Sequence, residues 1–355
     1  MRLEDLHSAR LFEMDKCIKD YQIPCRWVPD LGGSYGYPFF NFYAPLPYYF
    51  GELTFLLSNN LAFSIRVLFI VSFFGSYLFI YILSRKYVGN LKAILLALIY
   101  SFVPYYLLNF YQRGVLGEMW ALMFFAATIY SLIRLREDIN IRNLLLSGIF
   151  IASLLTSSNL SQIIFVPLVL LVAAILFFKI KKSRFLWFSL GSLFLGLLLS
   201  SFYLLPKVFE SNLIHNGYLP IYAKESPAKQ AQSRYELLTG DTKILDFKEG
   251  SNWMSFKTEA NSHTIIRLSQ YYFPNWKVFV DGKQIPVDYK NNSTGLMTFI
   301  LGKGNHEIDA RLYDTPIRSL SNLITLMGIG ITTVLFFISF ARVRKWILYY
   351  RKGIN

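Results

Sequence analysis

Residues 160–205 decide the fold, and they read LSQIIFVPLVLLVAAILFF (160–178), KIKKSR (179–184) and FLWFSLGSLFLGLLLSSFYLL (185–205). Each apolar run is about 20 residues long, which is enough for a helix to cross a hydrocarbon core of ~30 Å. A short basic segment separates the two runs. The stretch therefore predicts a pair of membrane-spanning helices joined by a tight polar turn.

The composition of the whole chain agrees with a membrane protein. Of its 355 residues, 54% are hydrophobic and only 16% are charged, which is more apolar than an ordinary soluble protein. The sequence predicts seven spans, at 63–84, 92–110, 117–133, 143–156, 160–178, 185–205 and 320–340. We therefore expect a polytopic α-helical protein in the lipid bilayer.

The positive charges predict the orientation. A net charge of +14 would suit a nucleic-acid-binding protein, but the basic residues lie in short clusters between apolar runs, as the positive-inside rule describes. If Arg85 and Lys86 face the cytoplasm, the clusters at 134–142, 179–184 and 342–352 face it too. This predicts a multi-pass plasma-membrane protein with an outside amino terminus and no nucleic-acid partner. Because no export signal precedes that terminus, we also expect that a first helix is missing from this chain.

The region 206–318 has a different pattern, with short segments rich in β-branched and aromatic residues between turn signals. The predicted strands are 235–238, 243–247, 254–257, 264–269, 277–280, 285–289, 296–301 and 307–312. Asp281-Gly282 supplies the positive φ of a two-residue hairpin turn. The sequence therefore predicts an antiparallel β-sandwich outside the membrane.

These patterns predict five parts of the chain. Residues 1–60 form an external loop with interfacial helices, and residues 61–205 form the transmembrane bundle. Residues 206–318 form the extracytoplasmic β-sandwich, 319–341 the last transmembrane helix and 342–355 a cytoplasmic basic tail.

The first candidate site residues lie in the opening EDLHSAR, which contains Glu4, Asp5, His7 and Arg10. On a helix, His7 shares a face with Glu4 and with Arg10, at spacings of three residues. A carboxylate at the bilayer boundary can deprotonate an acceptor hydroxyl or hold a divalent metal. The alternative is a solvated helix start with ordinary charges.

A second candidate acid, Glu118, follows Arg113 at the predicted outer mouth between two spans. An ionisable group at such a position either anchors the helix at the interface or faces a site inside the bundle. The planar guanidinium of Arg113 suits a phosphate. Asp5 and Glu118 are the candidate metal ligands.

Aromatic residues and two cysteines fill the rest of the opening stretch. Trp27 and Tyr43 are candidates for packing on a sugar, although such residues also accumulate at membrane interfaces. Cys17 and Cys25 allow a disulfide if the stretch faces outward, and two unpaired thiols are the alternative.

Several motifs together resemble a known family. They are PCRWVP (24–29), GYP (36–38), FYAPLP (42–47), YQRG (111–114) with Gly117-Glu118, FYLLP (202–206) with Glu210, FPNW (273–276), Asp281-Gly282 and TPIR (315–318). The chain is similar to prokaryotic polytopic membrane proteins of GT-C-like glycosyltransferase architecture, which include the YfhO-like and the "6-pyruvoyl-tetrahydropterin synthase-related" membrane proteins. It departs from them at 156–159, where Thr-Ser-Ser-Asn replaces a Thr-His-Asn pattern.

The resemblance implies a function. Such enzymes place an acid in the first external loop as catalytic base or metal contact, and they use a polyprenyl-phosphate sugar as donor. It implies Asp5 as the base with Glu4 as the alternative, and Glu118 as a second acidic site residue.

Five residues are the candidates for binding substrate: His7, Arg10, Arg113, Trp27 and Tyr43. The expected enzyme is a hexosyltransferase that acts on a glycan or protein acceptor of the cell envelope. The alternative is a non-enzymatic scaffold, or a protein that translocates lipid-linked sugar, with a glycan-binding β-sandwich.

Overall fold

The computed structural model describes residues 3–215, 219–220 and 230–352, without the side chains of residues 3–5, 161, 215, 219–220 and 341–352. The chain folds as two compact units. Unit 1 contains Met1–Ser8, Tyr43–Leu204 and Ser321–Asn355, and unit 2 contains Ala9–Phe42 and Leu205–Leu320. One unit is helical and the other holds antiparallel sheets, which confirms the predicted fold class.

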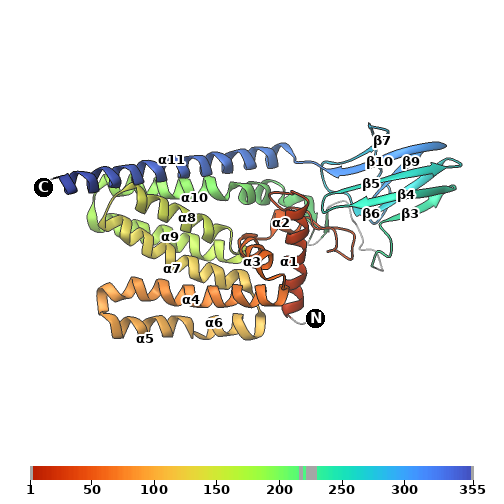
Figure 1. Cartoon of the computed structure of the whole chain (residues 1–355). Helices are drawn as coiled ribbons and strands as arrows, with labels where there is room; N and C mark the ends of the chain where they lie inside the picture. The colour runs from red at the N-terminus through yellow and green to blue at the C-terminus, as the bar shows by residue number, and fades with distance from the viewer. Residues whose placement is uncertain (1–2, 216–218, 221–229, 353–355) are drawn as a thin grey trace. The chain divides into compact units, whose positions relative to one another are not determined.

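Unit 1 is a bundle of apolar helices (Figure 1). Its elements are α3 (Leu46–Ser58), α4 (Leu61–Val88), α5 (Asn90–Ser101), α6 (Pro104–Leu108), the π-helix η1 (Asn109–Arg113), α7 (Leu116–Glu137), α8 (Ile141–Leu155), α9 (Asn159–Ile180), most of α10 (Ser183–Phe209) and most of α11 (Pro316–Lys352). Asparagine side chains cap two of them, because Asn60 accepts from the amide of Phe63 and Asn140 from that of Asn143.

Small residues let these helices approach one another closely. A Cβ atom on Gly148 of α8 would lie 2.8 Å from Leu195 of α10, and one on Gly196 of α10 would lie 2.5 Å from Ile151. Trp120 of α7 is buried and donates its indole N–H to the Leu68 carbonyl of α4. The close contacts at Gly148 and Gly196 are typical of helices in lipid, where burial of apolar surface gives no extra driving force for helix association.

The number of helices long enough to span a membrane is smaller than the seven predicted. Among the described residues, α4, α7, α9 from Gln162, α10 and α11 up to Phe340 are long and apolar enough. A sixth span is possible if α5 and the Pro104–Arg113 segment count as one, with a bend of 45°. The bend falls at Pro104, which cannot continue a helix hydrogen-bond ladder. The remaining predicted span is α8, whose 15 residues fall short of the ~20 that a bilayer requires.

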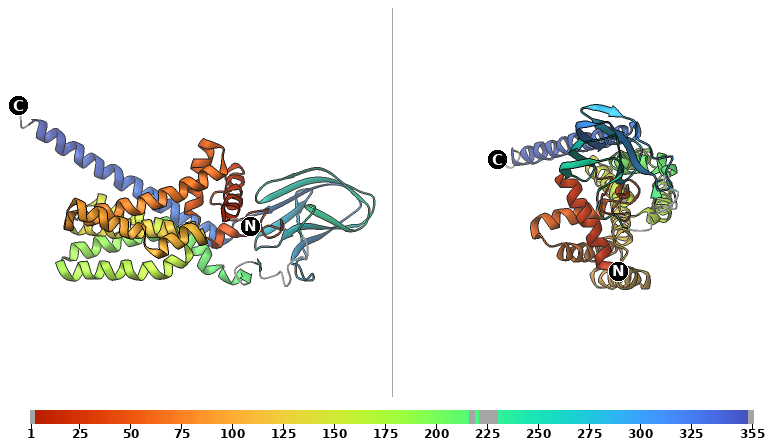
Figure 2. Two further views of the ribbon diagram at one scale, coloured as in Figure 1. Left: turned by 90° about the horizontal axis from the view of Figure 1, so that it is seen from below. Right: turned by 90° about the vertical axis from the view of Figure 1, so that its right-hand side faces the viewer.

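Unit 2 contains a β-sandwich (Figure 2). A five-stranded sheet has the order β4-β5-β10-β7-β8 and a three-stranded sheet the order β3-β6-β9. Their bounds are β3 (Tyr235–Thr239), β4 (Thr242–Glu249), β5 (Trp253–Ala260), β6 (Thr264–Tyr271), β7 (Trp276–Val280), β8 (Lys283–Ile285), β9 (Leu296–Leu301) and β10 (Gly304–Leu312), besides the short pair β1 (Ile214–His215) and β2 (Leu219–Pro220). All pairings are antiparallel.

The sandwich core comes from alternate residues of facing strands. Ile308, Ala310 and Leu312 of β10 are buried and pack in one cluster with residues of the other sheet, such as Ile266 and Phe299. This is the period of two that a half-buried strand requires. The predicted hairpin is present, since Asp281 (φ 50°) and Gly282 (φ 76°) join Val280 to Lys283. The predicted strand at 285–289 is shifted, because β8 ends at Ile285.

The opening segment completes unit 2. It includes α1 (Leu3–Lys19) from Ala9 onward and the short α2 (Phe39–Phe42). Trp27 is fully buried, with its ring 5.8 Å from those of both Phe273 and Trp276. Cys17 and Cys25 form a disulfide. The segment is therefore part of the hydrophobic core of the β-sandwich unit.

Candidate functional site

The candidate site lies in unit 1 around the carboxylate of Glu118, which is 4% exposed. Its Oε2 accepts hydrogen bonds from the Tyr105 hydroxyl at 2.5 Å and from Asn109 Nδ2 at 3.0 Å. Arg113 donates from Nη1 to Oε2 at 3.1 Å and from Nη2 to Oε1 at 3.3 Å. Four donors thus surround one carboxylate, and two of them form the paired geometry that arginine and carboxylate favour.

The local fold explains this convergence. Tyr105, Asn109 and Arg113 lie one after another along α6 and η1, four residues apart, so they share one helical face. Gly114 ends η1 in the left-handed conformation (φ 54°), and the chain then enters α7, whose first turn carries Glu118. A π-helical turn in a membrane helix is uncommon and often marks a functional position.

Gly117 lets the start of α7 lie against the backbone that follows α8. A Cβ atom at Gly117 would be 2.7 Å from the carbonyl oxygen of Ser157. Glycine is required there because any side chain would push this backbone away. The contact fixes the position of the neighbouring Glu118.

His7 connects the opening of α1 to the same loop. Its Nε2 lies 2.6 Å from the Gly114 carbonyl oxygen, and its Nδ1 lies 2.9 Å from the Tyr48 hydroxyl. Since a carbonyl oxygen only accepts, Nε2 carries the proton. In the neutral ring, Nδ1 then accepts from Tyr48. His7, which is 2% exposed, therefore links the start of α1 to the backbone that follows Arg113.

A pocket of about 270 Å³ opens beside the carboxylate. Its lining consists of Tyr105, Glu118, Leu122, Leu160, Ile164 and Phe165. The wall is apolar except for the Tyr105 hydroxyl and Glu118. Arg113, with 41% of its side chain exposed, forms an ion pair with Glu118. A lipid chain and a bound anion could therefore be held next to each other here.

The donor set at Glu118 does not fit a metal ion. Both carboxylate oxygens already accept from Arg113, whose positive charge would repel a cation. No cluster of three or more His, Cys, Asp or Glu residues suited to a metal occurs among the residues that the structure describes. The side chains of Glu4 and Asp5, which the sequence also proposed, lie outside the described residues.

The other predicted binding residues lie elsewhere. Arg10 belongs to unit 2, where its guanidinium lies 4.8 Å from the centre of the Phe39 ring. Trp27 is enclosed in the core of unit 2. Tyr43 is in unit 1 and half-buried, with its ring 6.2 Å from that of Tyr48. The structure therefore brings together Glu118, Arg113 and His7, but not these three.

Sequence reasoning missed Tyr105, Asn109 and Tyr48 as partners of the site. The spacing of four residues from Tyr105 to Asn109 and from Asn109 to Arg113 was a usable signal for the first two. It also missed Glu52, which is 3% exposed in α3. An acid in the apolar segment Leu46–Ser58 was the signal there, because buried carboxylates in such helices are rare.

Unit 2 contains a separate buried polar cluster centred on Glu210. Its carboxylate accepts from Arg318 Nε at 2.9 Å, from Asn41 Nδ2 at 2.9 Å and from the Thr315 hydroxyl at 2.6 Å. Arg26 in turn donates to Asn41 at 3.1 Å. Glu210 and Arg318 are 4% and 1% exposed, so this ion pair is almost completely shielded from solvent.

A second acidic group of unit 2 has an unusual protonation. Burial, aided by the negative charge of Asp30, raises the pKa of Glu13 to about 8. Burial also acts to raise the pKa of Asp30, but hydrogen bonds from Lys16 and Arg234 outweigh it and hold that pKa below its usual value. Glu13 is 2% exposed. At neutral pH, Glu13 is therefore protonated while Asp30 is ionised.

Comparison with known proteins identifies one family. A family model described as "6-pyruvoyl-tetrahydropterin synthase related domain; membrane protein" matches residues 40–217. This range covers unit 1 from α3 to α10, including Arg113 and Glu118. No curated protein and no solved structure matches the chain.

Proposed function

This chain belongs to the 6-pyruvoyl-tetrahydropterin synthase related family of membrane proteins, and we propose that it is a glycosyltransferase that uses a polyprenyl-phosphate sugar. The acceptor is a glycan or protein of the cell envelope, on the outer face of the plasma membrane. The observation that carries the proposal is the Glu118–Arg113 pair beside an apolar pocket. Pterin chemistry is not part of the proposal.

Sugar transfer from such a donor needs three features: a surface for the lipid chain, a group that binds the phosphate, and a base for the acceptor. The site around Glu118 provides the first two. The apolar wall of Leu122, Leu160 and Ile164 suits an isoprenoid chain. Arg113 suits the phosphate, because its side chain is partly exposed and a guanidinium has five N–H donors, of which Glu118 and Asn109 take three. Glu118 holds that guanidinium in place until the phosphate arrives.

The third feature is a base for the acceptor. Both oxygens of Glu118 already accept hydrogen bonds, from Tyr105, Asn109 and Arg113, so we look for the base elsewhere. We assign the base to Asp5, with Glu4 as the alternative. They precede His7 on α1 by two and three residues. The acceptor oxygen attacks the anomeric carbon and its proton passes to this carboxylate. The bond from the anomeric carbon to the phosphate oxygen breaks, and polyprenyl phosphate leaves.

Two observations support an outward-facing site. Cys17 and Cys25 form a disulfide, which persists in oxidising compartments and is rare in the cytosol. The turn between α9 and α10 carries the basic cluster of residues 179–184, which by the positive-inside rule faces the cytoplasm. The helices on either side of Arg113, α6 and α7, meet at the opposite end of the bundle from this turn (Figure 1).

The test is sugar transfer by the full chain in liposomes supplied with radiolabelled polyprenyl-phosphate hexose. We expect Arg113→Gln to lower transfer about 100-fold or more, as loss of a charged transition-state contact does, and Arg113→Lys to retain part of the rate. Arg85→Gln, in the last turn of α4, serves as the matched control because it removes an exposed arginine away from the pocket. The double variant Glu4→Gln/Asp5→Asn should stop transfer while donor binding persists.

The competing function is a non-enzymatic scaffold or a translocator of lipid-linked sugar. The hydrogen bonds from Tyr105, Asn109 and Arg113 to Glu118 favour a scaffold, because an ion pair that only stabilises the bundle would have the same arrangement. A scaffold predicts no new glycosidic bond with any variant, and a translocator predicts movement of labelled donor across the bilayer without transfer. Equal transfer by the wild type and the Arg113→Gln variant would contradict the proposed site.

A further inference from the structure

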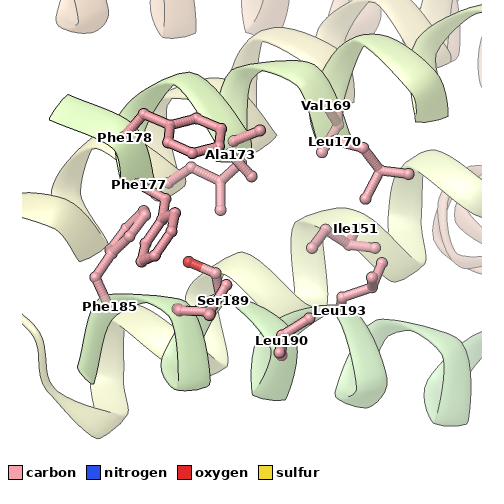
Figure 3. Close-up of a pocket in the computed structure, with 13 residues that line it drawn as sticks. Ile151, Val169, Leu170, Ala173, Phe177, Phe178, Phe185, Ser189, Leu190 and Leu193 are labelled. Carbon is pink, nitrogen blue, oxygen red and sulfur yellow. The ribbon is translucent and has the colours of Figure 1, made fainter. Parts of the chain in front are cut away.

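A second pocket of unit 1 lies between α9 and α10 (Figure 3). On α9 it begins at Val169, four residues after Phe165 of the Glu118 pocket. Its volume is about 250 Å³, close to the ~300 Å³ at which small-molecule pockets begin. The walls come from Val169 to Phe178 of α9 and Phe185 to Leu193 of α10, with one residue each from α7 and α8. Phe178 and Leu190 are 69% and 45% exposed, so the pocket opens to the surface of the bundle.

One polar atom faces this apolar space. The side-chain oxygen of Ser189 is directed into the pocket in Figure 3. It is buried, and it has no hydrogen-bond partner among the residues that the structure describes. The hydroxyls of neighbouring helical serines are satisfied locally, as when Ser192 donates to the Ser189 carbonyl at 2.8 Å. An unsatisfied buried hydroxyl is costly, and a ligand with an acceptor atom would remove that cost.

A strongly basic turn joins two residues that line the pocket, Phe178 and Phe185. The turn from α9 to α10 carries Lys179, Lys181, Lys182 and Arg184, which are all exposed. Lys181 adopts the left-handed conformation (φ 53°) that reverses the chain between the two helices. No acidic residue lies in 179–184, whereas the basic segment 134–142 also contains Glu137 and Asp138. The four charges of this turn are therefore not neutralised within it.

We propose that this pocket binds an anionic glycerophospholipid, with one acyl chain between α9 and α10 and the phosphate against the basic turn. Ser189 donates to an ester carbonyl of the same lipid. Six residues separate Ser189 from the start of α10 at Ser183, which is about 9 Å along the helix axis. The basic turn, the Ser189 hydroxyl, and Leu190 with Leu193 therefore follow one another along the chain, in the order of phosphate, ester and acyl chain in the lipid.

The test compares phosphatidylglycerol with phosphatidylcholine of identical acyl chains, added to the delipidated full-length protein and counted by native mass spectrometry. We expect the wild type to retain phosphatidylglycerol at least about tenfold better. The variant Lys179→Ser/Lys181→Ser should lose most of that preference. The matched control Arg85→Ser/Lys92→Ser removes two exposed charges from the turn between α4 and α5 and should keep it.

Two further variants separate the pocket from general surface charge. Ser189→Ala should weaken retention of both lipids about fivefold, the effect of one hydrogen bond, and it leaves the helix intact. Ala173→Phe fills the pocket and should reduce binding of both lipids, with folding checked by circular dichroism. Equal retention of the two lipids by the wild type, an equal loss in the control, or wild-type retention by Ser189→Ala would overturn the proposal.

Discussion

Replacing Glu13 by glutamine should change how the stability of the protein depends on pH. In the folded state, burial raises the pKa of this carboxyl from 4.5 to about 8. Between these two values the folded protein keeps a proton that the unfolded chain releases. Stability of the wild type therefore falls as the pH rises through this window, and the contribution is fully present only below pH ~4.5.

The magnitude follows from the shift. Each pKa unit corresponds to ~1.4 kcal/mol, and a shift of this size gives a loss of about 3–5 kcal/mol between pH 5 and pH 9. Glutamine keeps the shape and a hydrogen-bond donor but has no proton to lose. We therefore expect Glu13→Gln to be far less sensitive to pH, and to be the more stable protein at pH 9.

The assay is thermal unfolding of full-length protein in one detergent between pH 5 and pH 9, recorded for the wild type and for Glu13→Gln. Glu236→Gln is the matched control, because the side chain of Glu236 is 60% exposed beside Arg267 and should alter stability by no more than ~0.5 kcal/mol. Parallel pH profiles for the wild type and Glu13→Gln would refute the reasoning, as would a wild type that gains stability relative to the variant when the pH rises.

Two predictions concern close packing and buried charge. Gly117→Ala should lower the free energy of unfolding by about 1–3 kcal/mol, because its Cβ would meet the Ser157 carbonyl oxygen at 2.7 Å. The control is Gly330→Ala in α11, where nothing lies within 4 Å. This control should not destabilise the protein in the same thermal unfolding assay. Glu210→Ala should lower the free energy of unfolding by about 3–5 kcal/mol, since it leaves the buried guanidinium of Arg318 without its carboxylate. The double variant Glu210→Ala/Arg318→Met should unfold at a higher temperature than Glu210→Ala. An equal or lower unfolding temperature would contradict this account.

Local patterns predicted most elements of both units. The strand predicted at 296–301 is β9 with the same bounds, since alternation and flanking turns are contained in the sequence itself. The span predicted at 63–84 lies within α4 for the same reason. The segment at 143–156 also looked like a span, but a tight turn at Thr156 ends α8 after 15 residues.

Long-range packing could not be predicted in this way. Nothing local to residues 9–42 indicates that Trp27 is enclosed by Phe273 and Trp276. Likewise, Glu13 looks like an ordinary helical acid, because its raised pKa depends on its burial in the folded unit and on Asp30, which lies 17 residues further along the chain. At the candidate site, Glu118 and Arg113 were predicted as neighbours because they are five residues apart, whereas the bond from His7 to Gly114 spans 107 residues.

The composition of unit 2 has a consequence for the biosynthesis of the protein. Its first part, Ala9–Phe42, is made well before its second part, Leu205–Leu320. At ~5–20 residues per second, a ribosome needs roughly 14–56 s to proceed from residue 42 to residue 320. During this time Trp27 has no sandwich to enclose it, and its ring is open to water and to other chains. A chaperone that shields aromatic residues at the membrane surface would therefore act on the opening segment first, before any strand of the sandwich exists.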